Sequence, residues 1–331
     1  MCGAVASDGS YRESFMTRSI KFAAPIAVAA AAAFALPAQA AWPERPITML
    51  VGFKAGGGAD TLGRIVSKTI AAKHGWKFVI KNKSGAGGGV MAKALLKEKK
   101  DGYTIGMAVG DPFAFDTVVK KNLGYAADDF VYLGSIAKFQ MGIMAMKDKG
   151  WNTLDDAMKA AKAKGSITMG SMSLRLTMAS KLIARHYGVN IKTVPARGGR
   201  GVMNQLLGGH VDIGWGAGIQ ARYVSAGKMV ILASAIDEPL KQAPAKKTLV
   251  QLGMPLLDIS GFFIMVGAKG MPAESVQKIS SAIEEAVKSP DVKNLINQRL
   301  KLVAEFYGPD VLAARLKAGQ NAARKMAEAL K

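Results

Sequence analysis

Residues 47–60 read ITMLVGFKAGGGAD, and this stretch decides the fold. Its first five residues, Ile47 to Val51, form a short apolar and β-branched run that is typical of a buried strand. After the three glycines, apolar residues recur at helical spacing from Leu62 to Ile70. The sequence therefore predicts a strand, a glycine-rich turn and a helix. Such a turn presents backbone N–H groups at the positive end of a helix dipole, where an anion can bind.

A second turn of the same kind follows at 84–89, which reads SGAGGG. The apolar run Phe78 to Ile80 precedes it, and a helical pattern from Val90 to Leu96 follows. Two such turns in one domain predict a single anionic pocket. The glycines superficially fit a dinucleotide-binding turn, but residue 90 is not glycine and no acidic residue follows at the usual distance. We therefore expect no cofactor.

The first forty residues have the pattern of an export signal. Positive residues after Met16 precede an alanine-rich apolar run at 22–36, which ends in the small-residue motif Ala38–Ala40. A transmembrane anchor is the alternative, but the run is too short and too rich in alanine. We expect 1–40 to be a leader and signal peptide cleaved near Ala40, with Met16 as an alternative translation start.

The single cysteine, Cys2, lies in that leader, so the mature chain has no thiol, disulfide or thiolate metal site. Ala41 stands where a lipoprotein would need cysteine. We therefore expect a soluble protein of the periplasm of a Gram-negative bacterium.

The net charge of +21 is high enough to suggest nucleic acid as a binding partner. The lysines are scattered over predicted helix surfaces and aromatic residues make up only 7% of the chain. A solvated basic surface that attracts acidic ligands fits better, and we expect no nucleic-acid partner.

Short apolar runs alternate with helical patterns along the whole mature chain. A mature chain of about 290 residues is also longer than a single hydrophobic core usually serves. This pattern predicts an α/β protein of two domains. Catalytic motifs are missing: no histidine is paired at metal-ligand spacing, and no nucleophile elbow or phosphate loop occurs. The methionines at 141, 144 and 146 could bind a soft metal, but their spacing on an apolar segment fits flexible filling of the core better. We expect no catalytic residue and no metal site.

An ordered set of motifs carries a family resemblance. These motifs are WPERPI at 42–47, FKAGGGAD at 53–60, NKSGAGGG at 82–89, DGYT at 101–104, LLGGHVD at 206–212 and MPAE at 271–274. Together they resemble the substrate-binding proteins of tripartite tricarboxylate transporters, the Bug-type receptors. Each motif alone is weak, but the ordered set covers nearly the whole mature chain.

The resemblance implies a type II periplasmic-binding-protein fold, in which two α/β lobes enclose a ligand cleft. It places lobe one at 41–140 plus 262–331 and lobe two at 141–261. It implies capture of a small organic acid by lobe closure, in a monomer read by membrane transporter subunits or a sensor ectodomain. A secreted enzyme on an acidic substrate and an interaction module with a basic surface are the alternatives.

The resemblance, together with the cations that depart from it, suggests a set of ligand-binding residues. They are Phe53, Lys54, Gly56, Gly57, Gly58, Asp60, Ser84, Ala86, Gly87, Gly88, Asp111, Ser171, Ser173, Arg175, Arg197 and Asp212. The glycine-rich backbones are expected to hold one ligand carboxylate, with Phe53 as an apolar wall. Asp60 fits helix capping and water ordering better than direct contact. Ser171, Ser173 and Asp212 suit ligand contact or capping.

Four cations depart from the family pattern, namely Lys54, Arg175, Arg197 and Arg200. They either face solvent or bind a second acidic group. We hypothesise that the ligand is at least dianionic or bulkier than usual for the family.

Overall fold

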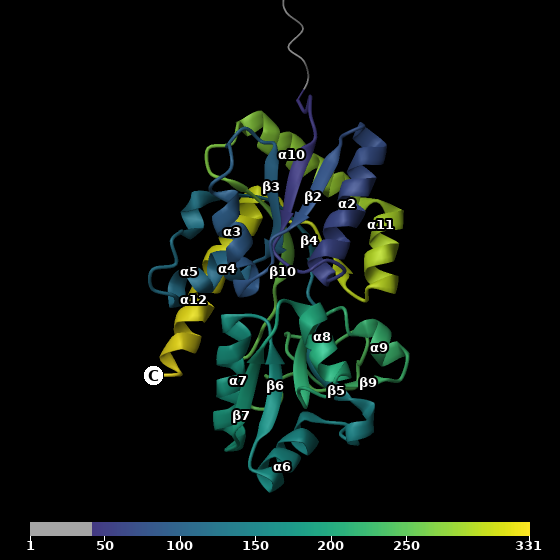
Figure 1. Cartoon of the computed structure of the whole chain (residues 1–331), viewed down its shortest axis with the longest axis vertical. Coiled ribbons are helices and arrows are strands. Elements are labelled where there is room, and N and C mark those ends of the chain that lie inside the picture. The colour runs from purple at the N-terminus through teal and green to yellow at the C-terminus, as the bar shows by residue number, and fades with distance from the viewer. Residues whose placement is uncertain (1–41) are drawn as a thin grey trace, which may run out of the picture. The chain divides into compact units, whose positions relative to one another are not determined.

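The computed structural model describes residues 42–331, so the predicted signal peptide and Cys2 lie outside the described residues. Residues 45–331 form one unit built on two β-sheets (Figure 1). No helix within the described range is long and apolar enough to cross a bilayer.

The first sheet has six strands in the order β11-β4-β10-β3-β1-β2. Their bounds are β1 Ile47–Val51, β2 Phe78–Asn82, β3 Thr104–Val109, β4 Phe130–Lys138, β10 Phe262–Ala268 and β11 Val303–Ala304. Strand β1 pairs in parallel with β2 and β3, whereas β10 is antiparallel to β3 and β4. The sequence prediction of a strand at 47–51 is confirmed.

The second sheet has five strands in the order β7-β6-β8-β5-β9. Their bounds are β5 Met141–Met146, β6 Ile167–Ser171, β7 Ile191–Pro195, β8 Ile213–Ala217 and β9 Met229–Ser234. Strand β6 is parallel to β7 and β8, whereas β5 is antiparallel to β8 and β9. The chain leaves the first sheet after β4 and returns to it at β10.

Helices cover both sheets. Around the first sheet, packed on its strands or on the helices that cover them, lie α2 Gly58–His74, α3 Gly89–Leu95, α4 Asp111–Ala114, α5 Asp116–Val119, α10 Ala273–Lys288, α11 Pro290–Asn294 and α12 Pro309–Glu328. Against the second lie α6 Leu154–Lys164, α7 Leu174–Tyr187, α8 Gly199–Leu207 and α9 Ala221–Ser225. We call these two layered assemblies the first lobe and the second lobe. The exact residue limits of the lobes stay a prediction.

The first helix packs closely on its sheet because it carries a glycine on the buried face. A Cβ atom at Gly63 of α2 would lie 3.1 Å from Sδ of Met49 and 3.3 Å from Cγ of Met107. Both methionines are fully buried, as is Met144 in the second sheet. Flexible thioether side chains thus fill the cores beneath the helices.

Candidate ligand-binding cleft

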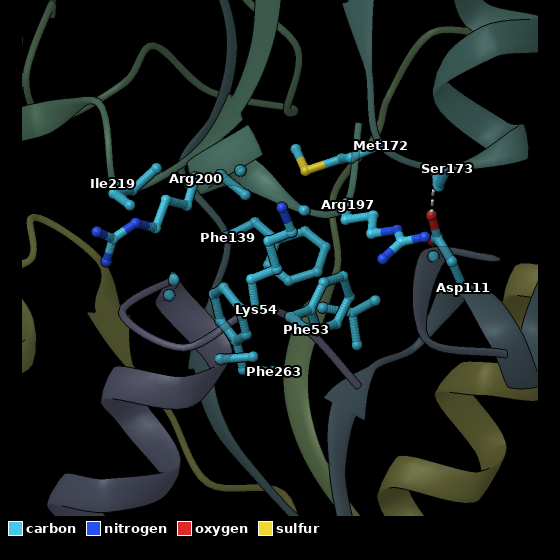
Figure 2. Close-up of a pocket in the computed structure, with 18 of the residues that line it drawn as sticks. Phe53, Lys54, Asp111, Phe139, Met172, Ser173, Arg197, Arg200, Ile219 and Phe263 are labelled. Carbon is cyan, nitrogen blue, oxygen red and sulfur yellow. Dashed lines mark hydrogen bonds between the residues drawn. The ribbon is translucent and has the colours of Figure 1, made fainter. Parts of the chain in front are cut away.

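A cavity of about 50 Å³ lies between the two lobes, where parallel strands of both sheets end (Figure 2). Residues after β1 and β3 line it from the first lobe, and residues after β6, β7 and β8 line it from the second. The carboxyl ends of parallel strands are the usual ligand site in α/β folds. Because one water needs about 10–15 Å³, this space holds only a few atoms unless flexible side chains move aside.

Eight of the sixteen predicted site residues line this cavity. They are Phe53, Lys54, Gly57, Gly58, Gly87, Asp111, Ser173 and Arg197. The other eight lie outside its lining, and they are Gly56, Asp60, Ser84, Ala86, Gly88, Ser171, Arg175 and Asp212. Direct contact of any of these residues with a ligand stays a prediction.

The two glycine-rich turns meet the opposing lobe without room for side chains. A Cβ atom on Gly87, whose φ is +66°, would lie 3.1 Å from Cβ of Ser173. Across the cleft, a Cβ atom on Gly198 would lie 3.0 Å from Cδ1 of Phe53. Glycine is therefore required at Gly87 both for its backbone conformation and for the approach of the lobes.

Aromatic rings form one wall of the cavity. Phe139 and Phe263 pack edge to face with ring centroids 4.9 Å apart, and Phe53 lines the same space. Phe53 is among the residues predicted from the sequence, whereas Phe139 and Phe263 are not. A signal for Phe139 exists, since it directly follows β4 at the crossing between sheets, whereas Phe263 lies inside β10. This wall suits the apolar part of a small solute.

Three cations also line the cavity. The side chains of Lys54 and Arg197 make no hydrogen bond or ion pair with any residue of the described range. Arg200 also lines the cavity, but its Nη1 donates to the carbonyl oxygen of Ala55 at 3.3 Å. Figure 2 shows Arg200 and Arg197 directed to opposite sides, with Lys54 between them. An anion is the natural guest for Lys54 and Arg197.

Asp111 is the acidic residue of the cavity lining, and its charge is already compensated. Its carboxylate accepts hydrogen bonds from Oγ of Ser173 at 3.3 Å and from Nη1 of Arg175 at 3.2 Å. Ser173 also caps α7 by accepting from the backbone N–H of Leu176. The structure therefore gives Ser173 the capping role that the sequence left open, beside a contact across the lobes.

Asp60, in the first turn of α2, holds the first glycine-rich turn in place through hydrogen bonds. Its carboxylate accepts from the N–H of Gly56 at 2.8 Å, from Nε of Arg64 at 2.9 Å and from Nδ2 of Asn82 at 2.9 Å. Burial alone would raise the pKa of Asp60, but these hydrogen bonds outweigh it and the pKa lies below its ordinary value. The carboxylate thus orders a turn of the cavity and lies outside the lining.

Two further predicted residues are occupied elsewhere. Asp212 accepts from the N–H and the hydroxyl of Thr168 at 3.0 and 2.7 Å, and from Nζ of Lys149 at 3.1 Å. Ser171 is buried and its hydroxyl bonds Thr177 and the carbonyl of Ser173. The structure therefore gives both residues bonds within the second lobe.

Comparison with known proteins agrees with this architecture. The family model described as "Tripartite tricarboxylate transporter family receptor" matches residues 62–310. A protein of Cupriavidus necator, named "UPF0065 protein in gbd 5'region", is 30% identical over 290 residues, covering 85% of this chain and 86% of that protein.

Solved structures resemble the chain over most of its length. The periplasmic binding protein BugD is 25% identical, with a TM-score of 0.79 over 87% of this chain and 97% of that chain. An R. palustris protein solved with adipate is 22% identical, with a TM-score of 0.80 over 87% and 98% of the two chains. These likenesses confirm the predicted two-lobed α/β fold. From the family match and the Cupriavidus relative together, the chain belongs to the tripartite tricarboxylate transporter receptor family.

Proposed function

We propose that this protein is a periplasmic receptor that captures a small organic acid and delivers it to a tripartite tricarboxylate-type transporter. The observation that carries the proposal is the cavity between the lobes. There the side chains of Lys54 and Arg197 have no hydrogen-bond or ion-pair partner within 42–331, and glycines of both glycine-rich turns line the space. The R. palustris structure with adipate supports a carboxylate as the ligand class.

Capture proceeds by docking and closure. One ligand carboxylate meets the backbone N–H groups of Gly58 in the first glycine-rich turn and of Gly87 in the second, as at other anion-binding turns. The lobes, at 41–140 plus 262–331 and at 141–261, then close about the two crossings between the sheets. Membrane transporter subunits then recognise the closed monomer. A sensor ectodomain is the alternative membrane partner.

The solute leaves the receptor chemically unchanged in this proposal. Support comes from membership of a receptor family and from the ion pair with Arg175, which engages Asp111, the acidic side chain of the cavity lining. Export by the predicted signal peptide at 1–40 places this capture in the periplasm.

A thermal-shift screen of the purified protein against mono-, di- and tricarboxylates, aromatic acids and acidic amino acids tests the proposal. A ligand at a hundred times its Kd stabilises the folded state by about 2.7 kcal/mol, which raises the Tm by a few degrees at this size. The neutral amide of each active acid serves as its control and should give no shift. The proposal fails if a folded sample responds to no acid, and NMR of the recovered ligand shows whether it is unchanged.

A further inference from the structure

The two unpaired cations of the cavity come from opposite lobes. Lys54 belongs to the turn after β1 in the first lobe, and Arg197 to the segment between β7 and α8 in the second. In Figure 2 the Lys54 side chain rises from its turn into the middle of the cavity, and the Arg197 side chain extends from the facing lobe. Both side chains remain exposed to solvent, so neither supports the core.

The charge balance of the cleft is positive when no solute is bound. The Asp111 carboxylate is paired with Arg175, so it does not neutralise Lys54 or Arg197. Closing the lobes thus brings two like charges toward each other and removes water from both. Like charges in a partly desolvated space repel, and a buried cation without a partner is costly.

Apolar rings line the space that these cations share. Phe53, Phe139 and Phe263 line the same cavity as both cations and offer no hydrogen-bonding side-chain atoms. A solute with one acidic group compensates one cation and leaves the other unpaired against this wall. A solute with an acidic group at each end of an apolar segment compensates both and fills the space between.

Resting on the proposed function, we infer that Lys54 and Arg197 determine the specificity of this receptor by selecting solutes with two acidic groups. Lys54 and the backbone N–H of Gly58 hold the group on the first lobe. Arg197 holds the second group with its planar guanidinium, which matches a carboxylate bidentately. The diacid thereby joins the lobes, and its charge sets the preference over a monoacid with the same carbon skeleton.

Isothermal titration calorimetry with matched acid pairs tests this inference. The pairs are succinate and butyrate, adipate and hexanoate, and terephthalate and benzoate. For at least one pair, the wild-type protein should bind the diacid at least about tenfold more tightly than the monoacid. Lys54→Met and Arg197→Met should each weaken diacid binding by about 10- to 100-fold, because each removes one charge-assisted contact. Either variant should bind the diacid no better than the monoacid.

Two variants with the same loss of charge serve as controls. Lys83→Met in the first lobe and Lys192→Met in the second remove exposed lysines outside the cavity lining. They should keep the wild-type preference for diacids, which excludes a general effect of net charge. Melting temperatures without ligand should be unchanged or higher in Lys54→Met and Arg197→Met, since each substitution removes a repulsive charge.

The outcomes separate the two proposals. Equal affinity for diacid and monoacid in the wild-type protein, or full diacid affinity in both cavity variants, overturns the inference and leaves the receptor proposal standing. If the wild-type protein binds no acid of either kind in this panel or in the broader screen, the proposed function itself fails. Loss of the preference in the control variants also overturns the inference, because selection would then not depend on these two cavity residues.

Discussion

Nη1 of Arg175 in α7 lies 3.2 Å from Oδ1 of Asp111 in α4, so an ion pair joins the second lobe to the first. The two side chains are only 15% and 13% exposed. Arg175 also donates to the carbonyl oxygen of Asp258 at 2.9 Å, close to the return of the chain into the first sheet. The sequence predicts that both residues contact the ligand; in the structure they bind each other, and ligand contact stays a prediction. The pair is an interlobe contact that forms without ligand atoms.

Breaking this pair should destabilise the protein. Arg175→Met leaves the half-enclosed Asp111 carboxylate without its cation, and we expect a loss of about 2 kcal/mol in the free energy of unfolding. Asp111→Asn should cost a similar amount. Urea denaturation of both single variants and the double variant measures the coupling, which should exceed about 1 kcal/mol.

The exposed pair between Arg45 and Asp101 provides the matched control. Its side chains are 56% and 38% exposed at an N–O distance of 2.8 Å. Asp101→Asn should change the unfolding free energy by less than about 1 kcal/mol. A coupling between Asp111 and Arg175 as small as that of this surface pair would contradict the interlobe role.

Gly87→Ala should reduce ligand affinity beyond its effect on stability. Gly87 has a φ of +66° and its Cβ position is 3.1 Å from Ser173, so alanine strains the backbone and separates the lobes. Gly75 at the end of α2 has a φ of +70° with nothing near its Cβ position, so Gly75→Ala isolates the backbone strain. Both variants should lose about 1 kcal/mol of stability from that strain.

Calorimetry with the acid found by screening distinguishes these two glycines. We expect Gly75→Ala to bind like the wild-type protein and Gly87→Ala to bind at least about tenfold more weakly, because the closed cleft must accommodate the new methyl group. Equal affinities in the two variants would show that the turn at Gly87 does not need to approach the second lobe.

Local sequence patterns predict the strands and helices next to the two glycine-rich turns, and the turns themselves. The strand at Ile47–Val51 and the helix at Gly58–His74 follow from hydrophobic spacing within about thirty residues, and such spacing is read directly from sequence. The cleft-facing rings were missed for a physical reason. Phe263 lies in a strand buried on both faces, so its sequence pattern is the same whether it contacts core or cavity.

The ion pair between the lobes could not be predicted from the sequence. Asp111 and Arg175 are 64 residues apart and belong to different lobes, so no local spacing brings them together. The same holds for the distinction among the four unusual cations. The side chains of Arg175 and Arg200 have partners, while those of Lys54 and Arg197 have none in the range 42–331, and only the folded arrangement separates the two cases.

The buried Asp60 should make stability depend on pH in the acid range. Its folded pKa lies below the ordinary value of 3.8, because hydrogen bonds to the carboxylate outweigh the effect of burial. The stabilisation is therefore fully present above about pH 5 and is lost as the pH falls through the folded pKa. Asp60→Asn should cost about 1–2 kcal/mol at pH 7, and the difference from wild type should shrink below pH 4. Urea denaturation at pH 7, 5, 4 and 3 measures this, and a difference that is constant down to pH 3 would contradict it.

Asp212→Asn should lower stability and leave ligand affinity unchanged. The carboxylate joins the start of β6 to the start of β8 through Thr168, and Lys149 completes its contacts. Burial tends to raise the pKa of Asp212, but the hydrogen bonds from Thr168 and Lys149 lower it below the ordinary value. An amide cannot accept all three bonds in the same way, and we expect a loss of about 1–2 kcal/mol in urea denaturation at pH 7. Because Asp212 lies outside the cavity lining, calorimetry should give the wild-type Kd. A weakened Kd with unchanged stability would place Asp212 at the ligand after all, as the sequence had allowed.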